Sequence, residues 1–184
     1  MDTKDSIMSS SVVTEEKTVS TNLTSHPLYD KWVLWAHLPH DTDWSIRSYK
    51  RISVVNSIEQ MLSLYSILPD KLIKNCMLFL MRDGIDPMWE HPDNRDGGCF
   101  SYKVGNKSVA QVWRNLSYIL VGETLTNNHK MGKIINGITI SPKRSFCIVK
   151  VWLKNCKIQN PEKLTEVPGL SPAGCLFKRH KPEY

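Results

Sequence analysis

The segment KIINGITISPKRSFCIVKVWL, residues 133–153, decides the fold class. Its two ends, Lys133–Ile140 and Phe146–Leu153, are rich in β-branched and other apolar side chains, as strands are. The intervening SPKRS is polar and contains a proline, which favours a turn. The segment therefore predicts an antiparallel hairpin with Lys143 and Arg144 at its basic tip.

Strand-like runs also occur upstream of this hairpin, at Lys31–Leu38, Tyr49–Val55, Cys76–Met81 and Gly97–Val104. Two longer segments instead repeat apolar side chains with the helical period. The first follows Asn56, which together with Glu59 resembles a capping box, and it ends before Pro69. The second begins at Val109 and ends at Gly122, a residue type common at the C-terminal caps of helices.

Strands in hairpin-like pairs and only two long helices predict a single α+β domain with a mostly antiparallel sheet. We expect this domain to span residues 26–184 and the polar residues 1–25 to form a disordered tail. The formal net charge of the 184 residues is +6. An excess of this size favours an acidic or phosphorylated partner without identifying one.

The composition argues against membrane and secreted proteins. No window approaches the ~20 consecutive apolar residues of a membrane span, and the N-terminus lacks the apolar segment of a secretory signal. The cysteines are scattered without metal-ligand spacing, as reduced thiols are: Cys76, Cys99, Cys147, Cys156 and Cys175. We therefore expect a cytoplasmic monomer without metal or other cofactor.

The most acidic stretch, residues 83–98, allows two interpretations. Its carboxylates could hold a divalent cation or supply an acid–base pair for a hydrolase: Asp83, Asp86, Glu90, Asp93 and Asp96. Their spacing does not match an EF-hand loop, however, and turns attract Asp and Gly for backbone reasons alone. A turn without metal is therefore the favoured interpretation.

The same stretch places Trp89 directly before Glu90, and a second loop carries Trp44. Two indole rings could stack on both faces of a flat cationic ring, and each stacking contact contributes roughly 1–3 kcal/mol. A carboxylate could accept two parallel hydrogen bonds from the N–H edge of guanine. The alternative is that both rings are ordinary partly buried side chains and Glu90 is a solvated turn residue.

From His26 to about Trp152 the sequence resembles the eukaryotic translation initiation factor 4E family. The segment DGIDPMWE, residues 83–90, is its most specific mark. The other marks are His26-Pro27-Leu28, Trp32-Val33-Leu34-Trp35, Trp44, Gly97-Gly98, Trp113, Gly122-Glu123 and Trp152.

The resemblance implies a curved antiparallel sheet with helices on its convex back. It also implies a non-enzymatic protein of translation initiation whose concave face binds the 7-methylguanosine 5′ cap of mRNA. The implied cap-binding residues are Trp44, Met88, Trp89, Glu90 and Trp152. Trp44 and Trp89 would stack on the base, Glu90 would accept from its N–H edge, and Trp152 would contact the methyl group. Trp32, Trp35 and Trp113 correspond to structural aromatics of the core.

The phosphate-binding positions of the family differ in this sequence. Its predicted hairpin is longer, and a simple alignment places Ile138 and Ile148 where the family has an Arg and a Lys. We expect Lys143, Arg144 and Lys150 to bind the cap phosphates instead.

The partner-binding surface of the family, which holds a helical peptide of the 4G scaffold or of a repressor, is also altered. His26, Pro27 and Ile58 match the family, whereas Leu62 replaces a tryptophan. On the second helix, Arg114, Asn115 and Tyr118 replace the usual residues. The resemblance implies that a 4G-type scaffold or another helical 4E-binding protein contacts His26, Pro27, Ile58, Leu62 and Tyr118. A cap-binding repressor or storage factor that does not recruit 4G is the alternative.

The C-terminal part resembles a shortened form of the family. The long third helix is trimmed, and the last strand is expected at Ala173–Phe177. Short, divergent members of this kind resemble the 4E paralogues of trypanosomatid parasites, which implies that a hypermethylated cap is one candidate ligand.

Overall fold

The computed structural model describes residues 25–182. The predicted disordered tail lies outside these residues except for Ser25. Within the described part, seven strands form one sheet in the order β2-β1-β3-β5-β6-β4-β7, and neighbouring strands pair antiparallel. This confirms the predicted α+β class and the hairpin of residues 133–153, which forms β5 and β6.

Each strand-like run of the sequence forms a strand in the structure. The strands are β1 (Pro27–His37), β2 (Tyr49–Ser57), β3 (Met77–Arg82), β4 (Gly98–Gly105), β5 (Ile135–Pro142), β6 (Phe146–Leu153) and β7 (Leu176–Arg179). The predicted last strand, Ala173–Phe177, begins too early, because β7 starts only at Leu176. Pro172–Gly174 form a 3₁₀ turn, η3, and proline favours the first position of such a turn. The chain therefore becomes extended only after this turn.

The two predicted helices are present as α1 (Ile58–Ile67) and α4 (Val109–Val121). The shorter helices are α2 (Asp70–Asn75), α3 (Pro92–Arg95), α5 (His129–Gly132), η1 (Ile46–Ser48) and η2 (Pro161–Lys163). The predicted cap of α1 at Asn56 was wrong by one residue, because β2 continues through Ser57. The Ser57 hydroxyl accepts from the Gln60 N–H at 3.2 Å, and the Gln60 side chain accepts from the Asn56 N–H at 2.9 Å.

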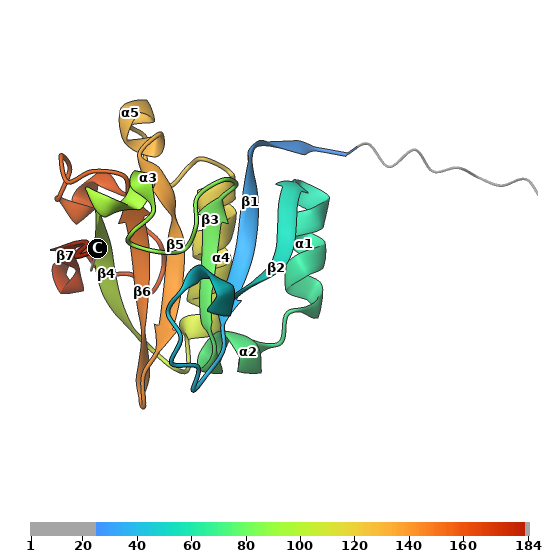
Figure 1. The fold of residues 1–184 in the computed structure, drawn as a ribbon. Coiled ribbons are helices and arrows are strands. Elements are labelled where there is room, and N and C mark those ends of the chain that lie inside the picture. Colours follow the sequence, from blue (N-terminus) through green and yellow to red (C-terminus); the bar gives the residue numbers. More distant parts are fainter. Residues whose placement is uncertain (1–24, 183–184) are drawn as a thin grey trace, which may run out of the picture.

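The two faces of the sheet follow from strand alternation. Leu34, Leu80, Ile138, Val151 and Phe100 are in register across five strands and belong to the larger core cluster, which also contains Trp32 and residues of α1 and α4. Figure 1 shows α4 behind the strands, so we call this side the helical face.

The opposite side of the sheet, the open face, carries a second and smaller apolar cluster. Phe79, Met81, Cys99 and Trp152 are its buried members, and Trp35 packs against them. Trp35 therefore packs in a different apolar cluster from Trp32 and Trp113, which belong to the larger core. Trp35 lies three positions from Trp32 in an extended strand, and residues at odd spacing point to opposite faces.

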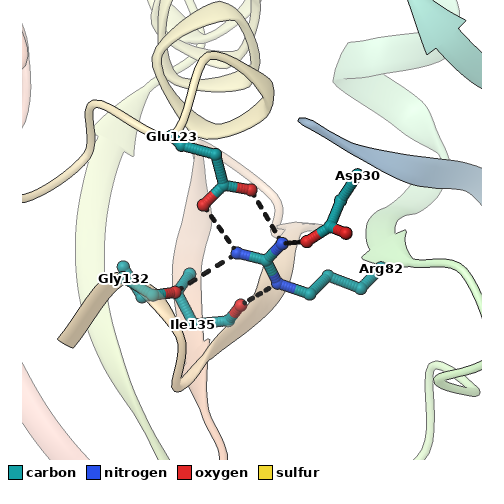
Figure 2. Close-up of polar contacts among 5 residues, drawn as sticks. All are labelled: Asp30, Arg82, Glu123, Gly132 and Ile135. Atoms are coloured by element: carbon teal, nitrogen blue, oxygen red, sulfur yellow. Dashed lines mark hydrogen bonds and ion pairs between the residues drawn. The ribbon is translucent and has the colours of Figure 1, made fainter. Parts of the chain in front are cut away.

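α4 ends where the sequence predicted, with Gly122 as its C-terminal cap residue. Gly122 has an ordinary φ of −77°, whereas Glu123 adopts the left-handed conformation with φ 56°. The Glu123 N–H donates to Leu120 O and the Thr124 N–H donates to Ile119 O, each at 3.0 Å, as in a Schellman motif. A glutamate is unfavourable there, but the Arg82 guanidinium donates to both Glu123 oxygens at 2.7 and 2.8 Å (Figure 2).

Candidate functional site

A row of aromatic rings crosses the open face and begins at Trp44, in the loop between β1 and β2. Trp44 is stacked on His37, with ring centroids 4.1 Å apart and an interplanar angle of 3°. His37 contacts Tyr49 edge-on at 5.2 Å, and Tyr49 contacts Phe79 at 5.3 Å. Phe79 in turn contacts Trp152 at 6.2 Å.

The row ends at Trp89 through a second histidine. Trp152 contacts His180 at 4.7 Å, and His180 is stacked on Trp89 at 5.8 Å with an interplanar angle of 10°. We call these seven rings the aromatic row: Trp44, His37, Tyr49, Phe79, Trp152, His180 and Trp89. The predicted ligand-binding tryptophans Trp44, Trp89 and Trp152 all belong to it. Trp44 is 55% exposed, Trp89 is half-buried and Trp152 is buried.

The loop that carries Met88, Trp89 and Glu90 is held by buried amides that the sequence did not single out. Asn94 is fully buried, and its side chain donates to Met88 O at 2.8 Å and to Asp86 O at 2.9 Å. The Asn136 side chain donates to the Asn94 side-chain oxygen at 2.9 Å. The only sequence signal was that Asn94 and Asn136 adjoin apolar or turn segments, which is too common to be specific.

Glu90 is half-buried and is close enough to two rings of the aromatic row to affect their charge states. Burial, with the Glu90 charge as a smaller cause, raises the pKa of Tyr49 to about 12. Burial lowers the pKa of His180, and the nearby Lys150 charge acts in the same direction. Around neutral pH, Tyr49 and His180 are therefore neutral beside the Glu90 carboxylate.

Lys150 lies on the open face beside the aromatic row. It is in register with Thr139 on β5 and with Ser101 on β4, and its ammonium is 5.7 Å from the centre of the Trp89 ring. Burial lowers the pKa of Lys150, and the charges of Lys143 and Lys178 lower it further. Excess positive charge in a partly desolvated position favours an anionic ligand.

The other two predicted phosphate-binding residues lie at the hairpin turn, and the two isoleucines aligned with the family's basic residues lie on opposite faces of the sheet. Lys143 and Arg144 are exposed at the turn between β5 and β6. Ile138 is fully buried in the core of the helical face, so a basic residue there would not reach the open face. Ile148 is half-buried on the same face as Lys150.

Two carboxylates of the acidic stretch form ion pairs with basic side chains. Asp83 pairs with Arg51 at 3.3 Å, and Asp93 pairs with Lys154 at 2.5 Å. Among residues 25–182, no group of three or more His, Cys, Asp or Glu side chains is arranged to hold a metal ion. In the same range, no helix has the length and apolarity needed to cross a membrane.

The geometry can be compared with known proteins. The sequence profile of the family described as Eukaryotic initiation factor 4E matches residues 27–170, most of the chain. The chain belongs to the eukaryotic initiation factor 4E family. The matched residues include β1 to β6, the loop that carries Trp44 and the loop that carries Trp89 and Glu90.

Individual relatives agree with this assignment. Eukaryotic translation initiation factor 4E-2 of Schizosaccharomyces pombe is 31% identical over 141 residues, 72% of this chain and 55% of that protein. The 4E homolog of Acanthamoeba polyphaga mimivirus is 30% identical, over 65% of this chain and 52% of that protein. The chain thus spans about half the length of these curated relatives.

Solved structures show the same fold. A chain in the complex of C. elegans eIF4E-3 with the 4E-binding protein Mextli and cap analog has a TM-score of 0.71 at 21% identity, covering 88% of this chain and 99% of that chain. Ascaris suum eIF4E-3, solved with the m2,2,7G cap, has a TM-score of 0.64 at 25% identity, covering 72% and 76%.

The predicted partner-binding residues of this 4E-family chain lie away from the open face. The His26 imidazole contacts the Glu59 carboxylate at 2.6 Å, and His26 O accepts from the Ile58 N–H at 2.9 Å. Pro27 and Ile58 line a cavity of about 820 Å³ that also contacts Glu123. The structure therefore brings together His26, Pro27 and Ile58 where β1 begins.

Leu62 and Tyr118 extend this surface along the helices. Ile58 and Leu62 are one turn apart on α1, 47% and 54% exposed, and Tyr118 on α4 packs edge-on against Tyr65 at 5.5 Å. The residues that replace the family's usual contacts have partners within the chain. Arg114 pairs with Asp70, and the Asn115 side chain accepts from Gln111 at 2.8 Å.

Proposed function

We propose that this chain binds the 7-methylguanosine 5′ cap of mRNA on its open face and acts in translation initiation. The methylated base stacks between Trp44 and Trp89, and Trp152 contacts the methyl group. The observation that carries the proposal is the aromatic row, which connects these three rings in a chain of the 4E family.

The chemistry of the site explains a preference for the methylated base. Methylation at N7 makes the guanine ring cationic, and a cation is attracted to the faces of the flanking indoles. The charge also makes the N–H edge of the base a better donor to the Glu90 carboxylate. The backbone of Met88 supports the site, because the Asn94 side chain holds the Met88 carbonyl directly before Trp89.

The triphosphate of the cap extends from the base toward Lys150. Support for this direction comes from the position of the Lys150 ammonium near Trp89 and from the influence of Lys143 on its charge state. Arg144, exposed beside Lys143, adds a further cation at the hairpin turn.

Relatives support both the ligand and a helical partner. Ascaris suum eIF4E-3 was solved with the m7G cap and with the m2,2,7G cap, so hypermethylated caps belong in the test. Schistosome eIF4E was solved with 4E-BP. For this chain we place a 4G-type or other 4E-binding helix on His26, Pro27, Ile58, Leu62 and Tyr118, since an amphipathic helix is recognised through apolar contacts on one face.

Quenching of intrinsic tryptophan fluorescence by 7-methyl-GTP, compared with GTP, tests the cap-binding proposal. We expect saturable quenching with a clear preference for 7-methyl-GTP, and we expect Glu90→Gln to weaken it far more than the matched control Glu162→Gln on η2. Equal or absent quenching by the two nucleotides would exclude the proposal.

A second candidate function is favoured by the helical surface. Exposed Leu62 offers less apolar contact than a tryptophan, and a tryptophan is a typical hot-spot residue. A chain that binds the cap but not the 4G scaffold would repress translation or store mRNA. Capture of a 4G-type scaffold by this chain, together with support of cap-dependent translation in a depleted extract, would exclude this candidate.

A further inference from the structure

We propose that His37 and His180 are positioning residues that hold Trp44 and Trp89 in the orientation that the cap requires. This inference rests on the proposed cap-binding function. Each histidine stacks its ring on one of the two tryptophans. One ring nitrogen of each histidine also donates a hydrogen bond to a backbone carbonyl in the loop of that tryptophan.

His37 lies at the end of β1 and is 2% exposed, whereas its stacking partner Trp44 is 55% exposed. The His37 Nε2 donates to Asp43 O at 2.9 Å. This carbonyl belongs to the peptide unit that joins Asp43 to Trp44, so the hydrogen bond fixes the backbone from which the indole extends. Tyr49 contacts the imidazole edge-on and limits its rotation.

The Asp43 side chain fixes the same loop from the other side of Trp44. One of its carboxylate oxygens accepts from the Ser45 N–H at 2.8 Å, and the other accepts from the Ser45 hydroxyl at 2.9 Å. These bonds restrain the backbone but leave the indole free to rotate. The stack on His37 is therefore the contact that selects the orientation of the exposed ring.

His180 has the matching arrangement at the other end of the aromatic row. It is 6% exposed, its Nδ1 donates to Asn94 O at 2.6 Å, and its backbone N–H donates to Gly97 O at 3.0 Å. Asn94 also holds the Met88 carbonyl, so His180 is connected to the Trp89 loop through its backbone as well as through its ring. The imidazole lies against both Trp89 and Trp152.

Histidine is suited to this role because its ring is flat and a ring N–H can donate to a carbonyl oxygen. Phenylalanine would keep the stack but lose the carbonyl bond, and alanine would lose both. An indole that is already ordered before the ligand arrives avoids part of the ordering cost of binding. Loss of one such restraint is expected to weaken binding by about two- to tenfold.

A double-mutant cycle between His37 and Trp44 tests the inference, with 7-methyl-GTP as the probe. We expect His37→Ala to weaken binding by about two- to tenfold in the wild-type chain and to have no further effect in the Trp44→Ala chain. His37→Phe keeps the stack and should retain most of the affinity. This variant keeps the test valid if His37→Ala does not fold. The matched control is His129→Ala, an exposed histidine on α5.

The same cycle applies to His180 and Trp89. A merely structural histidine would weaken binding equally with and without its tryptophan, so additive effects would overturn the positioning role. Unchanged affinity in both His37→Ala and His180→Ala would overturn it as well. If instead Trp44→Ala and Trp89→Ala leave binding intact, or the wild type does not prefer 7-methyl-GTP over GTP, the proposed function fails together with this inference.

Discussion

Replacing Arg82 with methionine should destabilise the fold at the edge of the loop that carries Trp89. The Arg82 guanidinium donates to both Glu123 oxygens, to Ile135 O at 2.8 Å and to Gly132 O at 3.2 Å, and it also pairs with Asp30 (Figure 2). Its cation lies 4.5 Å from the centre of the Trp32 ring.

The expected loss follows from burial. The Arg82 side chain is 14% exposed and that of Glu123 is 26% exposed, so removing the cation leaves a largely buried carboxylate without its partner. Breaking such a pair costs about 3–5 kcal/mol. Asp30 is 43% exposed and mostly screened by water, which favours the lower end of this range. We expect about 3 kcal/mol, or a melting temperature lower by ~6–12 °C.

Urea unfolding followed by circular dichroism measures this free energy. The matched control is Arg51→Met, because Arg51 pairs with Asp83 at the surface and such pairs contribute about 0–1 kcal/mol. Adding Glu123→Gly to Arg82→Met should recover part of the loss, since glycine tolerates the left-handed φ of that position. A loss for Arg82→Met no larger than that of Arg51→Met would refute the reasoning.

Three further predictions concern the site and α1. Lys150→Met should weaken binding of 7-methyl-GTP much more than binding of 7-methylguanosine, which lacks phosphates; equal effects in calorimetric titrations would contradict a phosphate role. His180 has a folded-state pKa below its ordinary value of 6.5, so the stability it contributes is present above pH 6.5 and is lost as the pH falls below that value. Denaturation at pH 7.5 and 5.5 should show a smaller pH-dependent loss in His180→Gln than in the wild type. Ser57→Ala should reduce the free energy of unfolding by about 1 kcal/mol through loss of the α1 cap, whereas Ser63→Ala should not.

Strand and helix positions were predictable because one face of each element is buried against a large core. The β-branched and apolar composition of the segment 133–153 and the helical period after Val109 both reflect this burial. Ends of elements were less predictable. Asn56 and Ser57 are both good capping residues, and only the pairing of β2 with β1 through Ser57 decides between them. The cap of α4 at Gly122 was predictable, but the left-handed conformation of Glu123, whose carboxylate is held by the distant Arg82, was not.

The candidate site was predictable only in part. Trp44, Trp89 and Glu90 were visible as an unusual combination in two loops, and the family pattern added Trp152. His37, Asn94, Asn136 and His180 were not visible as site residues. The contacts of Asn136 and His180 join segments far apart in the sequence, and the nearer contacts of His37 and Asn94 depend on how a loop folds. The contact between His180 and Asn94, for example, spans 86 residues. A lone histidine or asparagine carries no local pattern that would reveal such a partner.

The ratio of affinities for 7-methyl-GTP and GTP, measured by calorimetry on the wild type and on Trp44→Ala, tests the central claim most directly. A cationic ring between two indoles gains about 0.5–2 kcal/mol at each face relative to a neutral ring. We therefore predict a preference of roughly fivefold or more for 7-methyl-GTP in the wild type and a clearly smaller preference in Trp44→Ala. Equal affinities for the two nucleotides in the wild type would contradict the account.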